Sequence, residues 1–102
     1  MAHLITLFWR DIPAQVIAET GRGRNRQQSK IELPRRFAIA IDAAAMKDGA
    51  NSTDDYLAEW RKSAPEAREG SAEEIVLTEA QALEEQYDKT RLKALIDNDG
   101  WA

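Results

Sequence analysis

The sequence of 102 residues has no cysteine, which excludes disulfides, thiolate nucleophiles and cysteine-ligated zinc or iron–sulfur sites within the chain. It has one histidine, His3, close to the first residue, so a Ser–His catalytic pair has no well-placed base. The apolar run at residues 4–9 lacks a preceding basic segment and a following cleavage site, and no run approaches the roughly 18 residues of a membrane span. We therefore expect a cytoplasmic protein with no signal peptide, no membrane contact and no cofactor.

The composition is typical of a single small domain. Hydrophobic residues make up 43% of the chain and charged residues 31%, which indicates one folded domain over residues 1–102 rather than a disordered segment. The net charge of −4 is unevenly distributed. Residues 1–37 carry seven basic and three acidic side chains, whereas residues 38–102 carry seven basic and fifteen acidic side chains. This asymmetry predicts orientation toward an anionic partner, or else two parts of one fold that neutralise each other.

The first part of the chain, residues 1–20, predicts a β-hairpin. Both alternating rows of HLITLFWR, residues 3–10, are rich in apolar strand formers. Asp11 can then brace a turn by accepting backbone N–H bonds, and Pro13 restricts the residue before it to an extended conformation. Arg10 and Asp11 therefore lie where the chain reverses, which favours structural turn chemistry for this charge pair.

Residues 21–33 predict a basic loop or arm. The segment GRGRNRQQSK, residues 21–30, has no apolar residue, and a short extended segment follows before Pro34. The glycines do not have the spacing of a nucleotide-binding loop. We expect the sheet to keep an edge strand that is open, or is covered by this arm or by another chain.

Residues 34–102 predict three to four helices, so the fold class is α+β, with an N-terminal β-hairpin (a small antiparallel sheet) followed by helices packed on one face. The clearest local signal is a capping box that opens a helix at Ser71 with Glu74 three residues later. The remaining helix signals are Pro34 and Gly49, the apolar residues Tyr56, Leu57 and Trp60, the cap Asp88, the stop Gly100, and Trp101, which is expected to dock on the core.

Acidic side chains give little indication of catalysis or of a metal. The segment DNDG, residues 97–100, resembles the start of a calcium loop, but the sequence holds no twelve-residue loop there. Asp42 is the one acid inside a strongly apolar stretch, FAIAIDAAAM, and we expect it to form a structural ion pair with an arginine. A small enzyme that uses Asp42 or Asp11 with an arginine is the less favoured alternative.

A cluster of basic residues precedes the first predicted helix: Arg22, Arg24, Arg26, Lys30, Arg35 and Arg36. Guanidinium groups bind carboxylates and phosphates, so an acidic protein surface and nucleic acid are both candidate partners. A solvated loop without a partner is a third interpretation. The acidic overall charge and the lack of an aromatic side chain in the cluster favour a protein partner over nucleic acid.

Three blocks of the sequence, in this order, are similar to the small bacterial "virulence factor" domain family: FWRDIPAQV, LPRRFAIAIDAAAM and DDYLAEWR. The resemblance covers roughly residues 4–62 and implies an accessory subunit near folate- or corrinoid-linked methyl transfer. It implies no catalytic residues. The polar positions that match are Arg10, Asp11, Gln15, Arg35, Arg36 and Asp42.

The sequence therefore predicts a non-catalytic accessory module that binds a partner protein, with an enzyme of one-carbon metabolism as the candidate partner. The alternative is a nucleic-acid-binding protein that uses the arginine-rich arm. No catalytic or metal-binding residue is predicted. The predicted partner- or anion-binding residues are Arg10, Asp11, Gln15, Arg22, Arg24, Arg26, Lys30, Arg35 and Arg36, with Asp42 in a structural ion pair.

Overall fold

The computed structural model of the chain describes residues 2–21, 27–47, 49 and 53–102. The strands in these residues are β1 (Ala2–Trp9), β2 (Ile12–Thr20), β3 (Gln27–Glu32), β4 (Trp60–Lys62) and β5 (Glu66–Arg68). The helices are α1 (Arg35–Lys47), α2 (Thr53–Ala58), α3 (Ala72–Gln86) and α4 (Lys89–Asp97). The α+β fold class is confirmed. No helix of the described residues is both long and apolar enough to cross a membrane.

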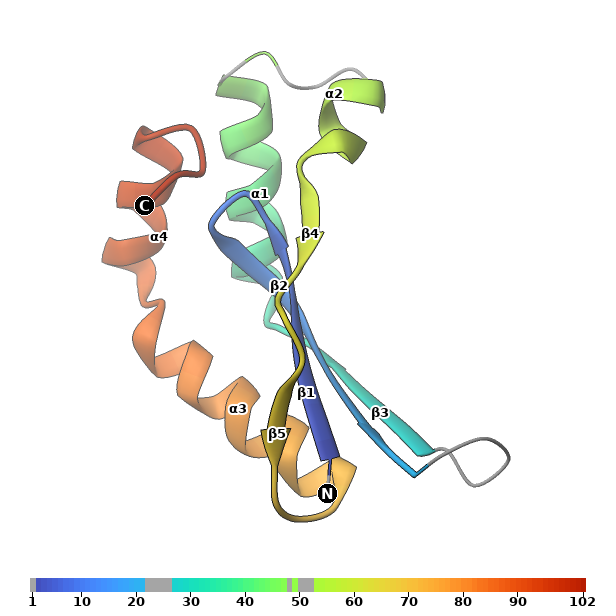
Figure 1. The fold of residues 1–102 in the computed structure, drawn as a ribbon. Helices are drawn as coiled ribbons and strands as arrows, with labels where there is room; N and C mark the ends of the chain where they lie inside the picture. Colours follow the sequence, from blue (N-terminus) through green and yellow to red (C-terminus); the bar gives the residue numbers. More distant parts are fainter. Residues whose placement is uncertain (1, 22–26, 48, 50–52) are drawn as a thin grey trace.

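The strands form one antiparallel sheet in the order β3-β2-β1-β4, and β5 pairs with β1 on the same side as β4 (Figure 1). The predicted hairpin is its centre: Leu4 lies opposite Ala18, and Trp9 opposite Ile12. Side chains alternate between the two faces of a strand. One face buries Leu4 and Val16 against the helices, whereas the other carries the partly exposed Ile5 and Leu7.

The helices lie along one side of the sheet and beyond its hairpin turn. In Figure 1, α3 and then α4 run up the left side of the view, and α1 stands beside the turn of the hairpin. α3 packs on β2 and β3, while α1 packs on β2 and α4. The core that they enclose is built on large side chains such as Trp9, Ile12, Val16 and Phe37, each no more than 1% exposed.

The caps of the last two helices are those that the sequence predicts. The Oγ of Ser71 accepts a hydrogen bond from the backbone N–H of Glu74 (3.2 Å), and Asp88 accepts one from the N–H of Arg91 (2.8 Å). Each cap satisfies a backbone donor that has no partner inside its helix. α3 and α4 therefore begin where the sequence places their first residues.

The structure differs from the sequence-based prediction at residues 27–32. These residues form β3, paired along its length with β2, rather than part of a loop. The polar segment pairs because β2 offers it a free edge, and because Ile31 faces the helix side of the sheet. Sheet context thus overrides a composition that alone favours a loop. Residues 22–26 of the predicted arm lie outside the described residues.

A second difference lies within residues 34–102, which contain β4 and β5 in addition to helices. The predicted second helix ends at Ala58, so Trp60 belongs to β4 and lies opposite Trp9 of β1. Between β4 and β5 in the sequence, the hydroxyl of Ser63 accepts a hydrogen bond from the N–H of Thr6 in β1 (2.8 Å). Three-residue strands are too short for a periodic pattern, and their pairing with β1 is a long-range effect.

Candidate functional site: a pocket between the sheet and the first two helices

Arg10, a predicted binding residue, is buried at the hairpin turn. Its side chain is inserted between the rings of Trp9 and Trp101, with its guanidinium carbon 4.7 Å and 5.3 Å from their ring centres. Its Nη1 donates a 2.6 Å hydrogen bond to the carbonyl of Asp99, and its Nε lies 3.7 Å from Glu59. With 6% of its surface exposed, Arg10 joins the hairpin to two distant segments of the chain rather than facing a partner.

Asp11 completes the same cluster. Its carboxylate accepts hydrogen bonds from Nη2 of Arg61 (2.9 Å) and from the N–H of Ala102 (2.8 Å). Its own N–H donates to the carbonyl of Gly100 (2.8 Å). We call Arg10, Asp11, Glu59, Arg61, Trp9 and Trp101 the turn cluster. Its charges find their partners within the chain, so the structural interpretation of the Arg10–Asp11 pair is the one that the geometry favours.

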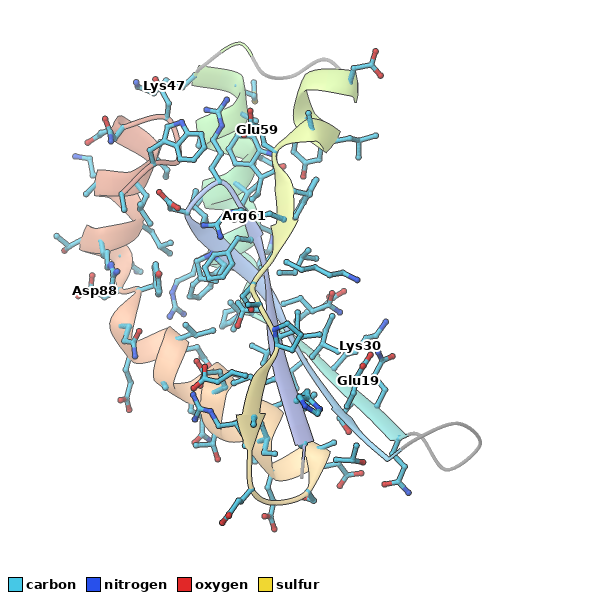
Figure 2. The ribbon with its side chains drawn as sticks, in the orientation of Figure 1. Glu19, Lys30, Lys47, Glu59, Arg61 and Asp88 are labelled. Carbon is cyan, nitrogen blue, oxygen red and sulfur yellow. The ribbon has the colours of Figure 1, made fainter. Side chains whose placement is uncertain are left out.

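The other predicted basic residues have different environments. Arg36 donates from Nη2 to the carbonyl of Glu84 (3.0 Å) and lies over the ring of Phe37, which ties α1 to the end of α3. Lys30 and Arg35 are exposed, and Figure 2 shows Lys30 near Glu19 at the outer part of the sheet. Arg22, Arg24 and Arg26 lie outside the described residues, so their predicted role stays a prediction.

A pocket of about 280 Å³ opens where β1, β2 and the end of β3 meet α1, α2 and β4. It brings together two polar residues that are far apart in the sequence, Gln15 and Asp42, and adds the carboxylate of Glu32. Aromatic side chains of Tyr56 and Trp60 line the same space. The remaining lining residues are Leu7, Ala14, Leu33, Ala38 and Ile41.

Local structure sets the position of each polar group in this pocket. Gln15 and Glu32 lie directly opposite each other on β2 and β3, so their side chains leave the sheet on the same face. Asp42 lies one position after the buried Ile41 on α1, which turns its carboxylate away from the core. The three groups therefore converge on the pocket from separate elements.

Asp42 does not form the predicted ion pair with any described arginine, and this expectation is corrected. It is exposed, and no cation of the described residues lies within salt-bridge distance of it. Its apolar neighbours Ile41 and Ala44 are buried in the core, whereas the Asp42 side chain reaches the pocket that Ile41 also lines. An exposed carboxylate retains its hydration, so it needs no partner inside the fold.

Tyr56 connects the pocket to the turn cluster. Its ring stacks on Trp9 and meets Trp60 edge to face, with ring centres 5.8 Å apart in both cases. Its carbonyl accepts a 2.9 Å hydrogen bond from the indole of Trp9. Burial raises the pKa of the Tyr56 phenol, the negative charge of Asp42 raises it further, and a hydrogen bond with Trp60 acts in the opposite direction.

The chemistry of the pocket suits a cation. None of the ten lining residues is basic, whereas Glu32 and Asp42 supply negative charge and the aromatic side chains of Tyr56 and Trp60 line the same space. In the described residues there is no group of three or more side chains that could hold a metal ion. The acidic and aromatic lining therefore fits an organic cation, such as a guanidinium or ammonium group, better than a bare metal.

Sequence reasoning identifies only part of this pocket. It singles out Gln15 as a matching polar position, but it assigns Glu32, Tyr56 and Trp60 to no site. It places Tyr56 and Trp60 on the apolar face of a helix, a pattern that does not distinguish a core from a pocket wall. The alternation of β3 is the signal that could have placed Glu32 beside Gln15, and it depends on recognising that strand.

Fold and site together define a small α+β domain with an acidic, aromatic pocket beside its sheet. The chain belongs to the Virulence factor family, whose model matches residues 7–96. No curated protein and no solved structure matches it. The resemblance found in the three sequence blocks is thereby confirmed.

Proposed function

We propose that this domain is a non-catalytic module that binds a partner protein, and that its pocket receives a basic side chain of that partner. The observation that carries the proposal is the negative charge of Glu32 and Asp42, unpaired within the described residues, beside two aromatic walls. An arginine is the best occupant, because its planar cation stacks on aromatic rings and forms two parallel hydrogen bonds with a carboxylate.

The composition of the pocket supports binding over catalysis. Its lining residues include no histidine and no lysine, and the phenol of Tyr56 has a raised pKa, which keeps it protonated at neutral pH. Family resemblance makes enzymes of folate- or corrinoid-linked methyl transfer the first partners to test. Nucleic acid is the less favoured partner, because the pocket is acidic and would repel phosphates.

Titration with a capped arginine amide, followed by NMR, tests the pocket directly. We expect the side-chain amide of Gln15 and the indole N–H of Trp60 to shift with millimolar affinity, while the buried indole of Trp9 does not. Asp42→Asn should weaken binding about three- to fivefold, as expected for a partly exposed charge pair. Asp88→Asn, a substitution of the same kind away from the pocket, is the matched control and should leave the affinity unchanged.

The partner itself is tested by affinity purification from the native host with wild type and with Asp42→Asn as bait. A protein recovered by wild type and depleted with the variant supports the proposal. Arginine amide shifts that do not involve Gln15 or Trp60, or recovery that does not depend on Asp42, would contradict it. Binding of duplex or single-stranded nucleic acid that weakens steeply with salt would favour the alternative.

A further inference from the structure

The sheet ends at β3, whose outer backbone groups have no strand beside them in the described part of the chain. The N–H of Leu33 donates to the carbonyl of Ala14 (3.0 Å), which fixes the alternation along the strand. Odd-numbered residues of β3 direct their N–H and C=O groups to β2. Gln28, Lys30 and Glu32 direct theirs outward, so three residues can bond a further antiparallel strand.

A groove runs beside this edge on the helix side of the sheet. One part, of about 480 Å³, is lined by Ile31 of β3 and by Val76 and Leu77 of α3. A second part, of about 560 Å³, continues along Gln27 and Ser29 toward the start of α3. Leu77 is 53% exposed although it is a large apolar residue. A strand added to β3 would place every second side chain in this groove and cover Leu77.

The charges of β3 select the strand that fits. Lys30 and Glu32 are two residues apart, so both side chains lie on the face of the sheet away from α3. Consider a second, antiparallel copy of β3 centred on Ile31. Lys30 of each copy then lies opposite Glu32 of the other, which forms two ion pairs, and the two Ile31 side chains meet on the groove side.

The neighbouring registers that keep the outward hydrogen bonds are unfavourable. Because the hydrogen-bonding groups alternate, the centre of the two strands can move only by whole residues. A centre at Lys30 places Lys30 opposite Lys30, and a centre at Glu32 places Glu32 opposite Glu32. Like charges directly opposite each other destabilise a sheet. Centring on Ile31 is thus favoured over both neighbours.

We propose that β3 pairs with β3 of a second copy of this chain about a two-fold axis at Ile31, which joins the two sheets into one and closes the groove over Leu77. An isologous contact of this kind uses the same surface on both copies, so assembly stops at the dimer. The proposed contact uses Glu32, which also lines the pocket, whereas Asp42, the other pocket carboxylate, takes no part in it.

Sedimentation velocity over a range of concentrations tests the proposal with a charge exchange. Wild type is expected to form dimers as its concentration rises. Lys30→Glu places two carboxylates opposite each other at each cross-strand pair, and Glu32→Lys places two ammonium groups there. Each variant alone should therefore dimerise at least about tenfold more weakly. In an equimolar mixture, a heterodimer pairs each introduced charge with its opposite, so association should recover to near wild-type affinity.

A separate variant reports on the groove: Leu77→Lys should weaken dimerisation, whereas Asp42→Asn should leave it unchanged. Leu77 is on the helix surface, so a circular dichroism melt is expected to show that the variant remains folded. A wild type that stays monomeric at every concentration would overturn the proposal, as would a mixture of the charge variants that does not associate. Loss of dimers with Asp42→Asn would assign the contact to the pocket side instead.

Discussion

Two clusters of charged and aromatic side chains differ in how completely the chain satisfies them. In the turn cluster, Arg10 has a carbonyl, a carboxylate and two ring faces around it, and Asp11 accepts two hydrogen bonds. In the pocket, Glu32 and Asp42 face open space without a described cation. Similar residue types thus stabilise the fold where they are paired and leave binding capacity where they are not.

Among the substitutions considered, Arg10→Ala in the turn cluster should cause the largest loss in the free energy of unfolding. It removes a buried cation and leaves the carbonyl of Asp99 and the side chain of Glu59 without their partner. We expect a loss of about 2–4 kcal/mol in the free energy of unfolding, measured by urea denaturation. Arg35→Ala, an exposed arginine on α1, is the control and should change it by less than about 0.5 kcal/mol. Equal effects of the two substitutions would show that the turn cluster has no special role.

Gly100→Ala should give the next largest effect. Gly100 has a φ of 91°, and a Cβ there would lie 3.0 Å from Cζ3 of Trp9 and 3.3 Å from Cδ of Arg10. Both the backbone conformation and the close approach oppose any side chain, so we expect a loss of about 1–3 kcal/mol. Gly49→Ala is a useful comparison, since Gly49 has a φ of 73° with nothing within 4 Å, so it reports backbone strain alone. If Gly100→Ala lowers the melting temperature no more than Gly49→Ala does, the close packing around Gly100 contributes nothing to the loss of stability.

The pKa of Tyr56, which contacts both the turn cluster and the pocket, should report on the charge of Asp42. Burial and the charge of Asp42 raise its pKa, so the folded state favours the neutral phenol. The neutral phenol therefore contributes to the free energy of unfolding below about pH 10, the pKa of a tyrosine in the unfolded chain. This contribution is lost as the pH rises through the higher pKa of Tyr56 in the folded state. In a Tyr87→Phe background, tyrosinate absorbance should show Asp42→Asn lowering the pKa of Tyr56. A pKa that does not respond would mean that Asp42 lies too far from the phenol to influence it.

Asp42→Asn should have the smallest effect on stability. The carboxylate is exposed and has no described ion pair, so we expect a change within about 0.5 kcal/mol in either direction by urea denaturation. A loss as large as that of Arg10→Ala would assign Asp42 to the fold instead of to a binding surface. This result together with weaker arginine binding would separate binding from stability at a single residue.

The fold could be predicted where local signals are strong. The caps at Ser71 and Asp88 and the apolar rows of the hairpin are encoded within a few residues, and the structure has them as expected. β3 and β4 depend instead on an edge that only the folded sheet offers. The pocket could not be predicted because its polar groups come from three elements, and because exposure of Asp42 on α1 depends on which side of the helix packs.

The contacts of Arg10 and Asp11 reach residues 99–102, close to ninety positions further along the chain. The hairpin leaves the ribosome before α4 and the residues after it. During synthesis its turn therefore lacks the contacts with residues 99–102. Contacts of such long sequence separation form late and slow the approach to the native state. A nascent chain that lacks residues 99–102 therefore leaves the indole of Trp9 and the guanidinium of Arg10 more open to solvent until the last residues cover the turn.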